Sequence, residues 1–171
     1  PTTPAELVEA AKTIKEKTGV TGFAVRSRLA EETPWWIDFN NWVVGFNGGW
    51  SNGEKLTIDS PQNIAAVTAY KAVYDSGGFS VGDDASTFRS KFGQGLVGMM
   101  IDATGAPPAM IGEKVPSKTV GASKLPFPGK STSQVGILFG NNANSKNKEL
   151  AKDFLNWFLV KDTQQAISEM I

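Results

Sequence analysis

Two short apolar runs constrain the possible fold more than any other feature: residues 96–101 (LVGMMI) and residues 135–140 (VGILFG). Each run holds six residues, whereas a membrane-spanning helix needs roughly 20. Continuous apolar runs of this length are typical of strands that are buried on both faces of a sheet. We therefore expect both runs to be internal strands that are covered by helices.

Segments with helical patterns lie around these runs. Thr3 and Glu6 form a capping box with a proline at the first helical position, which predicts a helix that ends at Gly19. Ser60, also followed by proline, predicts the start of a second helix. The apolar face expected for this second helix consists of Ile64, Val67, Tyr70 and Tyr74.

The rest of the chain alternates between shorter helices and strands. Further helices are expected over the aromatic-rich residues 35–44, after an N-cap at Asp83 or Asp84, after an N-cap at Ser145, and from about Asp162. Further strands are expected at residues 22–25, 56–58 and 119–122. This alternation indicates the α/β class. Because no linker or repeat interrupts it, we expect a single domain over residues 1–171.

The composition excludes several classes of function. The 17 basic and 17 acidic residues cancel, so the chain lacks the basic surface that nucleic-acid binding needs. It contains no cysteine and no histidine, which excludes disulfides, thiolate ligands, histidine-based catalytic triads and the common zinc sites. We therefore expect no cofactor, no metal, no nucleic acid as a partner and no direct insertion into a membrane.

A series of short motifs follows in order along the chain: PTT (1–3), EL (6–7), GF (22–23), NGG (47–49), DSP (59–61), FGQG (92–95), GIL (136–138) and NKELAKDF (147–154). In this order and spacing, the chain resembles the extracellular solute-binding proteins of ABC importers. The similarity is to the branch that includes maltose-binding and other sugar-binding proteins, and it extends over nearly the whole chain.

The resemblance implies one lobe of a type II periplasmic-binding-protein fold, with a central mixed sheet flanked by helices. Family members bind their ligand in a cleft between two lobes, and the typical opening strands of the first lobe do not occur here. We therefore expect a second lobe whose partners are the missing N-terminal lobe, a small polar solute (a sugar or polyol) and ABC permease subunits. The implied location is extracellular or periplasmic, with a lipid anchor at the missing N-terminus as one option.

The resemblance also indicates where the solute binds, because aromatic residues of sugar-binding relatives line the cleft in the segment that matches residues 35–39. Sugars present apolar C–H faces and hydroxyls, so their sites combine flat rings with carboxylates or amides. Trp35, Trp36, Asp38 and Phe39 supply both kinds of group. The alternative is that the rings are core residues at a helix start.

A second group of candidate ligand-binding residues follows the strand at 96–101: Asp102, Thr104 and Gly105. Open α/β sheets bind ligands outside their strand ends, where this carboxylate could accept from a hydroxyl or an amine. The alternative role of Asp102 is to cap the turn that follows. Sugar-binding relatives often carry a stacking tryptophan at this place, and its absence favours a solute smaller than a long maltodextrin.

Two other functions compete with solute capture for transport. A carboxylate-based glycosidase would use two acids, and the available ones are Glu31, Glu32, Asp38 and Asp102. None of them lies in a recognisable catalytic motif, so we expect no enzymatic activity. A lectin-like or protein-interaction module would instead use exposed tryptophans.

Overall fold

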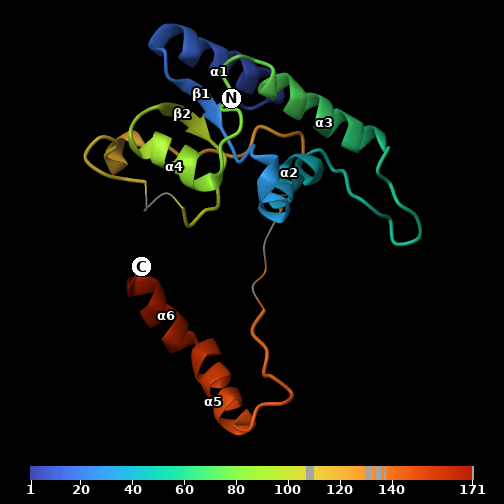
Figure 1. The fold of residues 1–171 in the computed structure, drawn as a ribbon, viewed down its shortest axis with the longest axis vertical. Helices are drawn as coiled ribbons and strands as arrows, with labels where there is room; N and C mark the ends of the chain where they lie inside the picture. The colour runs from blue at the N-terminus through green and yellow to red at the C-terminus, as the bar shows by residue number, and fades with distance from the viewer. Residues whose placement is uncertain (107–109, 130–131, 134–135, 137, 171) are drawn as a thin grey trace. The chain divides into compact units, whose positions relative to one another are not determined.

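The computed structural model describes residues 1–106, 110–129, 132–133, 136 and 138–170, which group into two compact units, Pro1–Gln134 and Val135–Ile171 (Figure 1). Each unit is described by itself. The expectation of a single lobe over residues 1–171 stays a prediction.

The first unit contains a two-stranded parallel sheet. Strand β1 (Thr21–Ala24) pairs with β2 (Val97–Met100), and Ala24 lies opposite Met100. Both strands lie where the sequence predicts them. The described strands are all parallel, whereas a mixed sheet was expected. Gly98 is exposed, so β2 is less completely buried than its apolar sequence suggested.

Helix α1 (Pro4–Thr18) covers β1 because the backbones approach closely. Thr3 caps the helix by accepting from the Glu6 N–H at 3.2 Å, and Gly19 ends it with a φ of 77°. A Cβ at Gly22 would lie 2.0 Å from the carbonyl oxygen of Ala11, so only glycine fits at this contact. The Glu6 carboxylate accepts from Thr2 rather than from the cap residue, so the capping box is only half formed.

The main core lies between α2 (Thr33–Gly45) and α3 (Pro61–Tyr74), and α3 also packs beside α1 (Figure 1). The fully buried Trp42 packs on Phe127 with ring centroids 4.8 Å apart. This contact ties the predicted loop at residues 124–134 to the core. The core therefore depends on α2 as much as on the sheet.

The apolar face predicted for α3 is wrong for Ile64 and Val67, whereas Tyr70 packs against the core as predicted. Ile64 is 56% exposed and Val67 is 48% exposed, whereas Ala66 and Val73 are fully buried. The buried polar residue Asn63 explains the difference, because its hydrogen bonds to the preceding loop fix the rotation of the helix.

The side chain of Asn63 connects three parts of that loop. Its Nδ2 donates to the carbonyls of Gly49 (2.8 Å), Thr57 (2.9 Å) and Ile58 (3.3 Å), and its Oδ1 accepts from the Gly49 N–H at 3.0 Å. A buried amide with this many partners replaces the hydration of four backbone groups.

Helix α4 (Ala85–Gly93) begins at Asp84, whose carboxylate accepts from the Thr87 N–H at 2.8 Å. Its Phe88 is fully buried against Ala24 and Val97. Of the two predicted capping residues, Asp84 is therefore the cap.

Two predicted strands do not form. In residues 56–58, the only pairing among the described residues is an isolated bridge between Leu56 and Ser51, and Leu56 is 74% exposed. The 3₁₀ turn η3 (Ser117–Thr119) occupies the start of the other predicted strand, and residues 120–122 are irregular. Among the described residues, neither segment lies in a sheet with another strand, and a strand needs such a partner for its backbone hydrogen bonds.

The second unit contains α5 (Lys148–Leu159) and α6 (Lys161–Met170). Ser145 does not cap α5 as expected, because its Oγ accepts from the Asn147 N–H at 3.1 Å, before the helix begins. Residues 135 and 137 of the predicted strand lie outside the described residues. The described Leu138 and Phe139 are irregular and exposed.

Replacing Asn63 with alanine should lower the free energy of unfolding by about 2–3 kcal/mol, because several buried backbone groups lose their partner. Thr68→Ala removes a hydroxyl that bonds within the exposed side of the same helix and should change stability by less than about 0.5 kcal/mol. Denaturant unfolding followed by tryptophan emission measures both values. Equal losses in the two variants would contradict the role assigned to Asn63.

Candidate functional site

Two of the predicted site residues, Asp38 and Asp102, lie close enough to influence each other near the carboxyl ends of the two parallel strands. Arg26 comes two residues after the end of β1, and Asp102 comes two residues after the end of β2. Because Ala24 and Met100 are register partners, both charged residues leave the sheet at the same edge. This edge is where open α/β sheets bind ligands.

Residues after Arg26 hold the end of β1 in place. The Ser27 and Arg28 N–H groups donate to the backbone carbonyl of Asp83 at 2.9 and 3.1 Å. The buried Asp83 carboxylate in turn accepts from Lys91 Nζ of α4 at 2.7 and 2.8 Å. The backbone next to Arg26 is therefore held by hydrogen bonds to a buried segment, and Arg26 does not lie in a loose loop.

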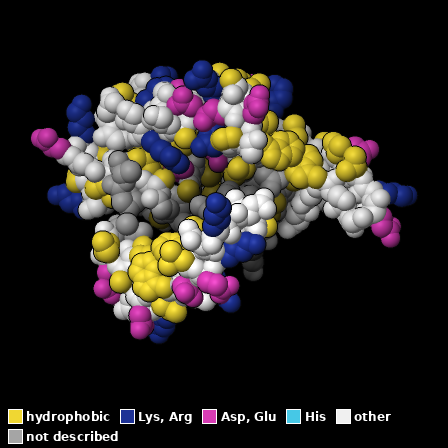
Figure 2. All heavy atoms as spheres, turned by 60° about the horizontal axis from the view of Figure 1, so that its bottom comes forward, with side chains coloured by type: hydrophobic (Ala, Val, Ile, Leu, Met, Phe, Trp, Pro, Cys, Tyr) yellow, Lys and Arg dark blue, Asp and Glu magenta, His cyan; other side chains and the backbone are white. Residues whose placement is uncertain are grey.

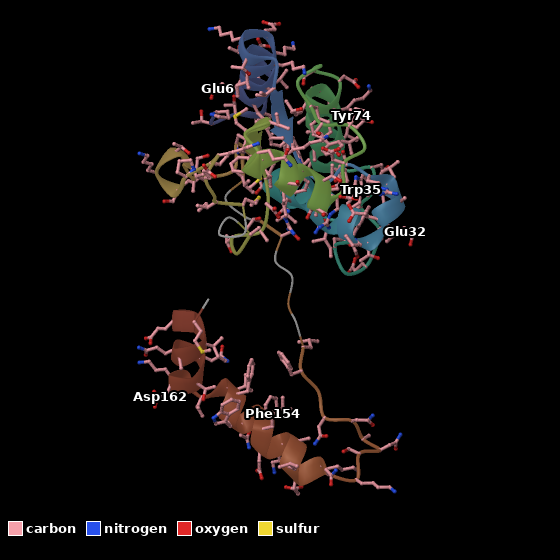
Figure 3. The ribbon with its side chains drawn as sticks, turned by 60° about the vertical axis from the view of Figure 1, so that its left-hand side comes forward. Glu6, Glu32, Trp35, Tyr74, Phe154 and Asp162 are labelled. Atoms are coloured by element: carbon pink, nitrogen blue, oxygen red, sulfur yellow. The ribbon has the colours of Figure 1, made fainter. Side chains whose placement is uncertain are left out.

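The start of α2 presents its candidate residues in different directions. Successive helical residues are rotated by about 100°, so Trp35 and Phe39 share one side, while Trp36 and Asp38 point to nearly opposite sides. Figure 3 shows Trp35 at this end of the helix, near Glu32. A monosaccharide-sized solute cannot contact both Trp36 and Asp38.

Trp35 lies on a layer of buried rings. It stacks on Phe39 with centroids 5.2 Å apart and an interplanar angle of 4°, and Phe39 meets Tyr70 edge-on at 5.3 Å. Phe39 is only 8% exposed, so it supports Trp35 from the core. Burial is the main cause that raises the pKa of Tyr70, as expected for a phenol inside this layer.

Trp36 also packs on Phe39, with ring centroids 6.2 Å apart, but its nearer aromatic partner is Trp50. Trp36 is 43% exposed and packs against Trp50, with ring centroids 4.5 Å apart. The Trp50 Nε1–H donates to Asn40 Oδ1 at 2.8 Å. The two neighbouring tryptophans therefore share Phe39 as a partner, and only Trp36 packs on Trp50.

A cluster of five charged side chains lies at the strand ends. Arg26 Nε is 3.2 Å from Glu31 Oε2 and 3.6 Å from Asp38 Oδ2. Arg89 of α4 donates to Asp102 through Nε (2.6 Å) and Nη2 (2.7 Å). We refer to these residues as the charge cluster.

Asp38 is the acid of this cluster whose ionisation is most altered. Burial is the main cause that raises its pKa, the charges of Asp102 and Glu31 add to it, and Arg26 and Arg89 oppose it. Because Asp102 and Arg89 affect the pKa of Asp38, the Arg89–Asp102 pair lies close enough to interact with the group formed by Arg26, Glu31 and Asp38. Arg26 Nε and Glu31 Oε2 are buried and form an ion pair. Their geometry does not meet the criteria of a hydrogen bond, and neither atom has another hydrogen-bond partner among the described residues.

The three predicted site residues after β2 differ in their hydrogen bonds and exposure. Asp102 uses Oδ1 to accept from both Arg89 and the Ala103 N–H at 2.7 Å, so it caps the turn and also binds an arginine. Thr104 and Gly105 are exposed in that turn. No described hydrogen bond links either of them to the charge cluster, and their place in a binding site stays a prediction.

Sequence reasoning missed several residues of this region, namely Arg26, Arg89, Trp50, Tyr70 and Asn41. Arg26 could have been found from its position directly after a predicted strand. Asn41 Oδ1 accepts from Thr132 Oγ1 at 2.6 Å and from the Ser133 N–H at 2.9 Å, which brings the predicted loop onto α2. That contact joins residues about ninety positions apart, and no local pattern indicates it.

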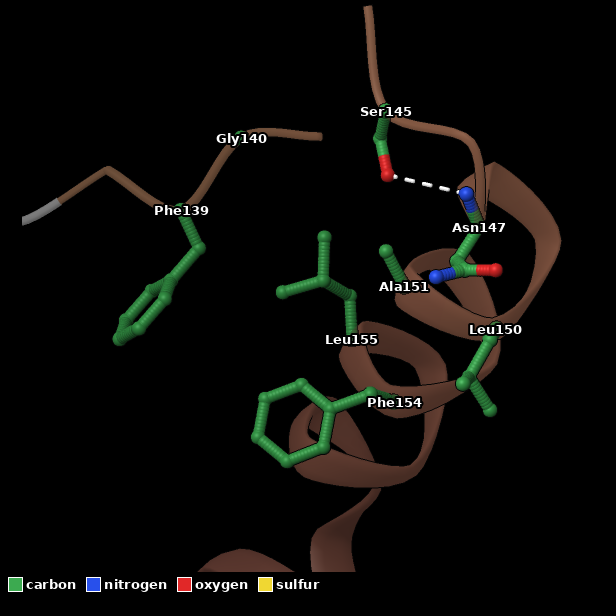
Figure 4. Close-up of a pocket in the computed structure, with 8 residues that line it drawn as sticks. All are labelled: Phe139, Gly140, Ser145, Asn147, Leu150, Ala151, Phe154 and Leu155. Atoms are coloured by element: carbon green, nitrogen blue, oxygen red, sulfur yellow. Dashed lines mark hydrogen bonds between the residues drawn. The ribbon is translucent and has the colours of Figure 1, made fainter. Parts of the chain in front are cut away.

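The second unit has a hollow of about 560 Å³ that is lined chiefly by apolar side chains, including Phe139, Leu150 and Phe154 (Figure 4). Of its two polar lining residues, Ser145 accepts from the backbone N–H of Asn147, and the side-chain amide of Asn147 takes no part in that bond. Figure 2 shows hydrophobic side chains gathered on this unit, where Trp157 is 57% exposed. A hollow with so few free polar groups is a poor site for a hydroxyl-rich solute.

Within the described residues, no helix is long and apolar enough to cross a membrane, and no group of three or more acidic residues is arranged to hold a metal.

Comparison with known families gives the chain its classification. The family model described as bacterial extracellular solute-binding protein matches residues 1–165. The chain belongs to this family. The resemblance inferred from the short motifs is therefore confirmed, and the family consists of solute-binding receptors rather than enzymes.

Solved structures of similar fold include two to which the chain can be compared directly. Maltose-bound MalE3 of T. maritima is 26% identical with a TM-score of 0.76, and the match covers 96% of this chain and 44% of that one. A solute-binding protein of Agrobacterium radiobacter K84 in complex with ribitol is 22% identical with a TM-score of 0.70, covering 99% and 45%.

A cyclic α-maltosyl-1,6-maltose-binding protein of Arthrobacter globiformis is 19% identical with a TM-score of 0.62, covering 95% of this chain and 42% of that one. No curated protein matches the chain. The chain of this solute-binding family member thus spans less than half the length of these solved structures, and the α/β fold expected from the sequence is confirmed.

Asp38→Asn should stabilise the protein at neutral pH. Because burial raises the Asp38 pKa in the folded state, the contribution of Asp38 to stability is present below its unfolded pKa and is lost as pH rises through the folded one. The difference in the free energy of unfolding between the variant and the original protein should therefore grow, in favour of the variant, from about pH 4 upward. Urea unfolding at several pH values measures this.

Asp84→Asn is the control with the opposite sign. Hydrogen bonds from Thr87, followed by the interaction with Arg28, lower the pKa of Asp84. Its stabilising contribution is present above the unfolded pKa and disappears as pH falls, so this variant should lose stability at neutral pH and not in acid. If the two variants changed the free energy of unfolding in the same direction as pH rises, the opposite pKa shifts of Asp38 and Asp84 would be refuted.

Proposed function

We propose that this chain is the solute-binding lobe of an ABC-importer receptor that captures a sugar, a sugar alcohol or a small oligosaccharide. The observation that carries the proposal is the site at the carboxyl ends of β1 and β2. There the half-buried Trp35 ring, supported by Phe39, lies on the same helix as a partly exposed carboxylate, Asp38. This combination suits a solute with C–H faces and hydroxyls.

The similar structures support this class of solute. Their bound or named ligands are maltose, ribitol and cyclic α-maltosyl-1,6-maltose, which are all rich in hydroxyls. Thr104 and Gly105 are exposed and carry no ring, so the turn after β2 offers no stacking surface. We infer that the site takes a short solute.

The other partners follow from membership of the family. The similar structures are more than twice as long as this chain, so a second lobe would form the opposite wall of the cleft. ABC permease subunits would then receive the solute from the closed receptor. The extracellular family supports an extracellular or periplasmic location, and the receptor would act without chemical conversion of its solute.

Trp35→Ala should weaken the binding of a small polyol about tenfold, a loss of about 1.4 kcal/mol of binding free energy, because the C–H groups of the polyol lose their aromatic contact surface. Trp36→Ala is a matched control one position away, on the side of α2 that points away from Asp38. It should change polyol affinity less than threefold. Calorimetry on the two-lobed protein measures both.

Trp35→Phe keeps an aromatic ring against Phe39 and separates stacking from folding. It should retain stability and most of the affinity. Equal weakening by Trp35→Ala and Trp36→Ala, for a ligand no larger than a monosaccharide, would contradict the placement of the solute beside Trp35.

The 171-residue chain alone should bind solute weakly or undetectably, because closure around a ligand needs contacts from both lobes. Calorimetry comparing the chain with the two-lobed protein tests this. Sub-micromolar affinity of the chain alone would refute its role as half of a cleft. A thermal-shift screen of the two-lobed protein against sugars and polyols tests the proposed function itself, and a panel without any stabilising solute would refute it.

A further inference from the structure

We propose that the Arg89–Asp102 pair makes this site selective for uncharged solutes: Arg89 donates to the solute, and Asp102 is the positioning residue that holds the guanidinium and compensates its charge. The inference rests on the proposed function and adds to it the charge class of the solute.

The first support is the geometry of the pair. Two parallel hydrogen bonds, of 2.6 and 2.7 Å, join the guanidinium to the carboxylate, the arrangement that fixes an arginine most firmly. The Ala103 N–H holds the same carboxylate at 2.7 Å. Asp102 therefore fixes where the Arg89 side chain lies.

The second support is the direction in which the pair is exposed. The side chain of Asp102 is 7% exposed, whereas that of Arg89 is 36% exposed. In the part of the chain that the structure describes, Arg89 Nη1 makes no hydrogen bond. A solute can therefore reach a free donor of Arg89 but hardly the carboxylate behind it.

The third support is the charge balance. Arg26 faces Glu31 and Asp38, just as Arg89 faces Asp102, so the cluster combines two cations with three carboxylates. Hydrogen bonds to Asp102 are the main cause that raises the pKa of Arg89, and the charges of Asp38 and Glu31 raise it further. An anionic solute would meet compensated arginines and one surplus carboxylate, whereas a hydroxyl can accept from Arg89 without adding charge.

The pair also joins α4 to the end of β2, and a purely structural role would predict no preference for ligand charge. Affinities of neutral and anionic solutes of similar shape therefore distinguish the two roles. Suitable pairs are ribitol with ribonate and maltitol with maltobionate, since both members of each pair carry the same open chain.

The first measurement uses the unaltered two-lobed protein in calorimetry at neutral pH and about 50 mM salt, where charge effects are weakly screened. At least one neutral compound should bind, and about tenfold more tightly than its acid. Equal or tighter binding of the acid would overturn the proposal. Binding of neither pair would overturn the proposed function together with it.

The second measurement uses Asp102→Asn. With Asp38 and Glu31 still present, the variant loses the surplus negative charge of the cluster as well as the direct partner of Arg89. The ratio of the affinity for the acid to that for the neutral compound should therefore rise about tenfold, and the change should shrink at 0.5 M salt. Arg89→Gln should weaken neutral binding without moving the ratio toward the acid. Asp84→Asn, which removes the carboxylate paired with Arg28 at 3.3 Å, is the matched control and should leave the ratio unchanged.

Equal weakening of the neutral and acidic ligands by Asp102→Asn would show a structural role only and would overturn the proposal. Thermal unfolding of each variant identifies loss of the fold. If Asp102→Asn does not fold, the ratio of neutral to acidic affinity measured on the unaltered protein still tests whether the site prefers uncharged solutes.

Discussion

The parallel pairing of β1 with β2 is the constraint on which the site depends. It joins segments that are far apart in the chain and sets Ala24 opposite Met100. Arg26 and Asp102 consequently leave the sheet together, and α4 can bring Arg89 to Asp102. A shift of the register by one residue would reverse the direction of every side chain on the shifted strand. The charge cluster would then lose its arrangement.

The charge cluster is costly for a small unit to maintain. Partly buried carboxylates lose hydration, and ion pairs in such places often fail to recover that cost. The raised pKa of Asp38, caused first by burial, and the unpartnered Arg26 Nε are signs of this cost. Asp38 and Arg89 are partly exposed side chains of the cluster that a solute with hydroxyls could contact. This gives a physical reason for a binding site to retain charges that the fold alone does not need.

Sequence patterns predicted the elements whose signals are local. The cap at Thr3, the helix start at Ser60 and the strand at 97–100 depend on neighbouring residues and were confirmed. Part of the apolar face of α3 was predicted wrongly because the hydrogen bonds of Asn63 to the loop before it outweigh the apolar periodicity. For the site, the sequence indicated Trp35 and Asp38 but not Arg26 or Arg89, whose importance comes from the partners that the fold gives them.

The sequence by itself determined the family, the α/β class and the presence of rings and acids at the start of α2, because composition, caps and motif order are properties of the chain. Only the tertiary structure decided that Trp36 packs on Trp50 and that Asp102 binds Arg89. Those facts depend on helix rotation and on strand register. Both are set by packing between segments that are distant in the sequence.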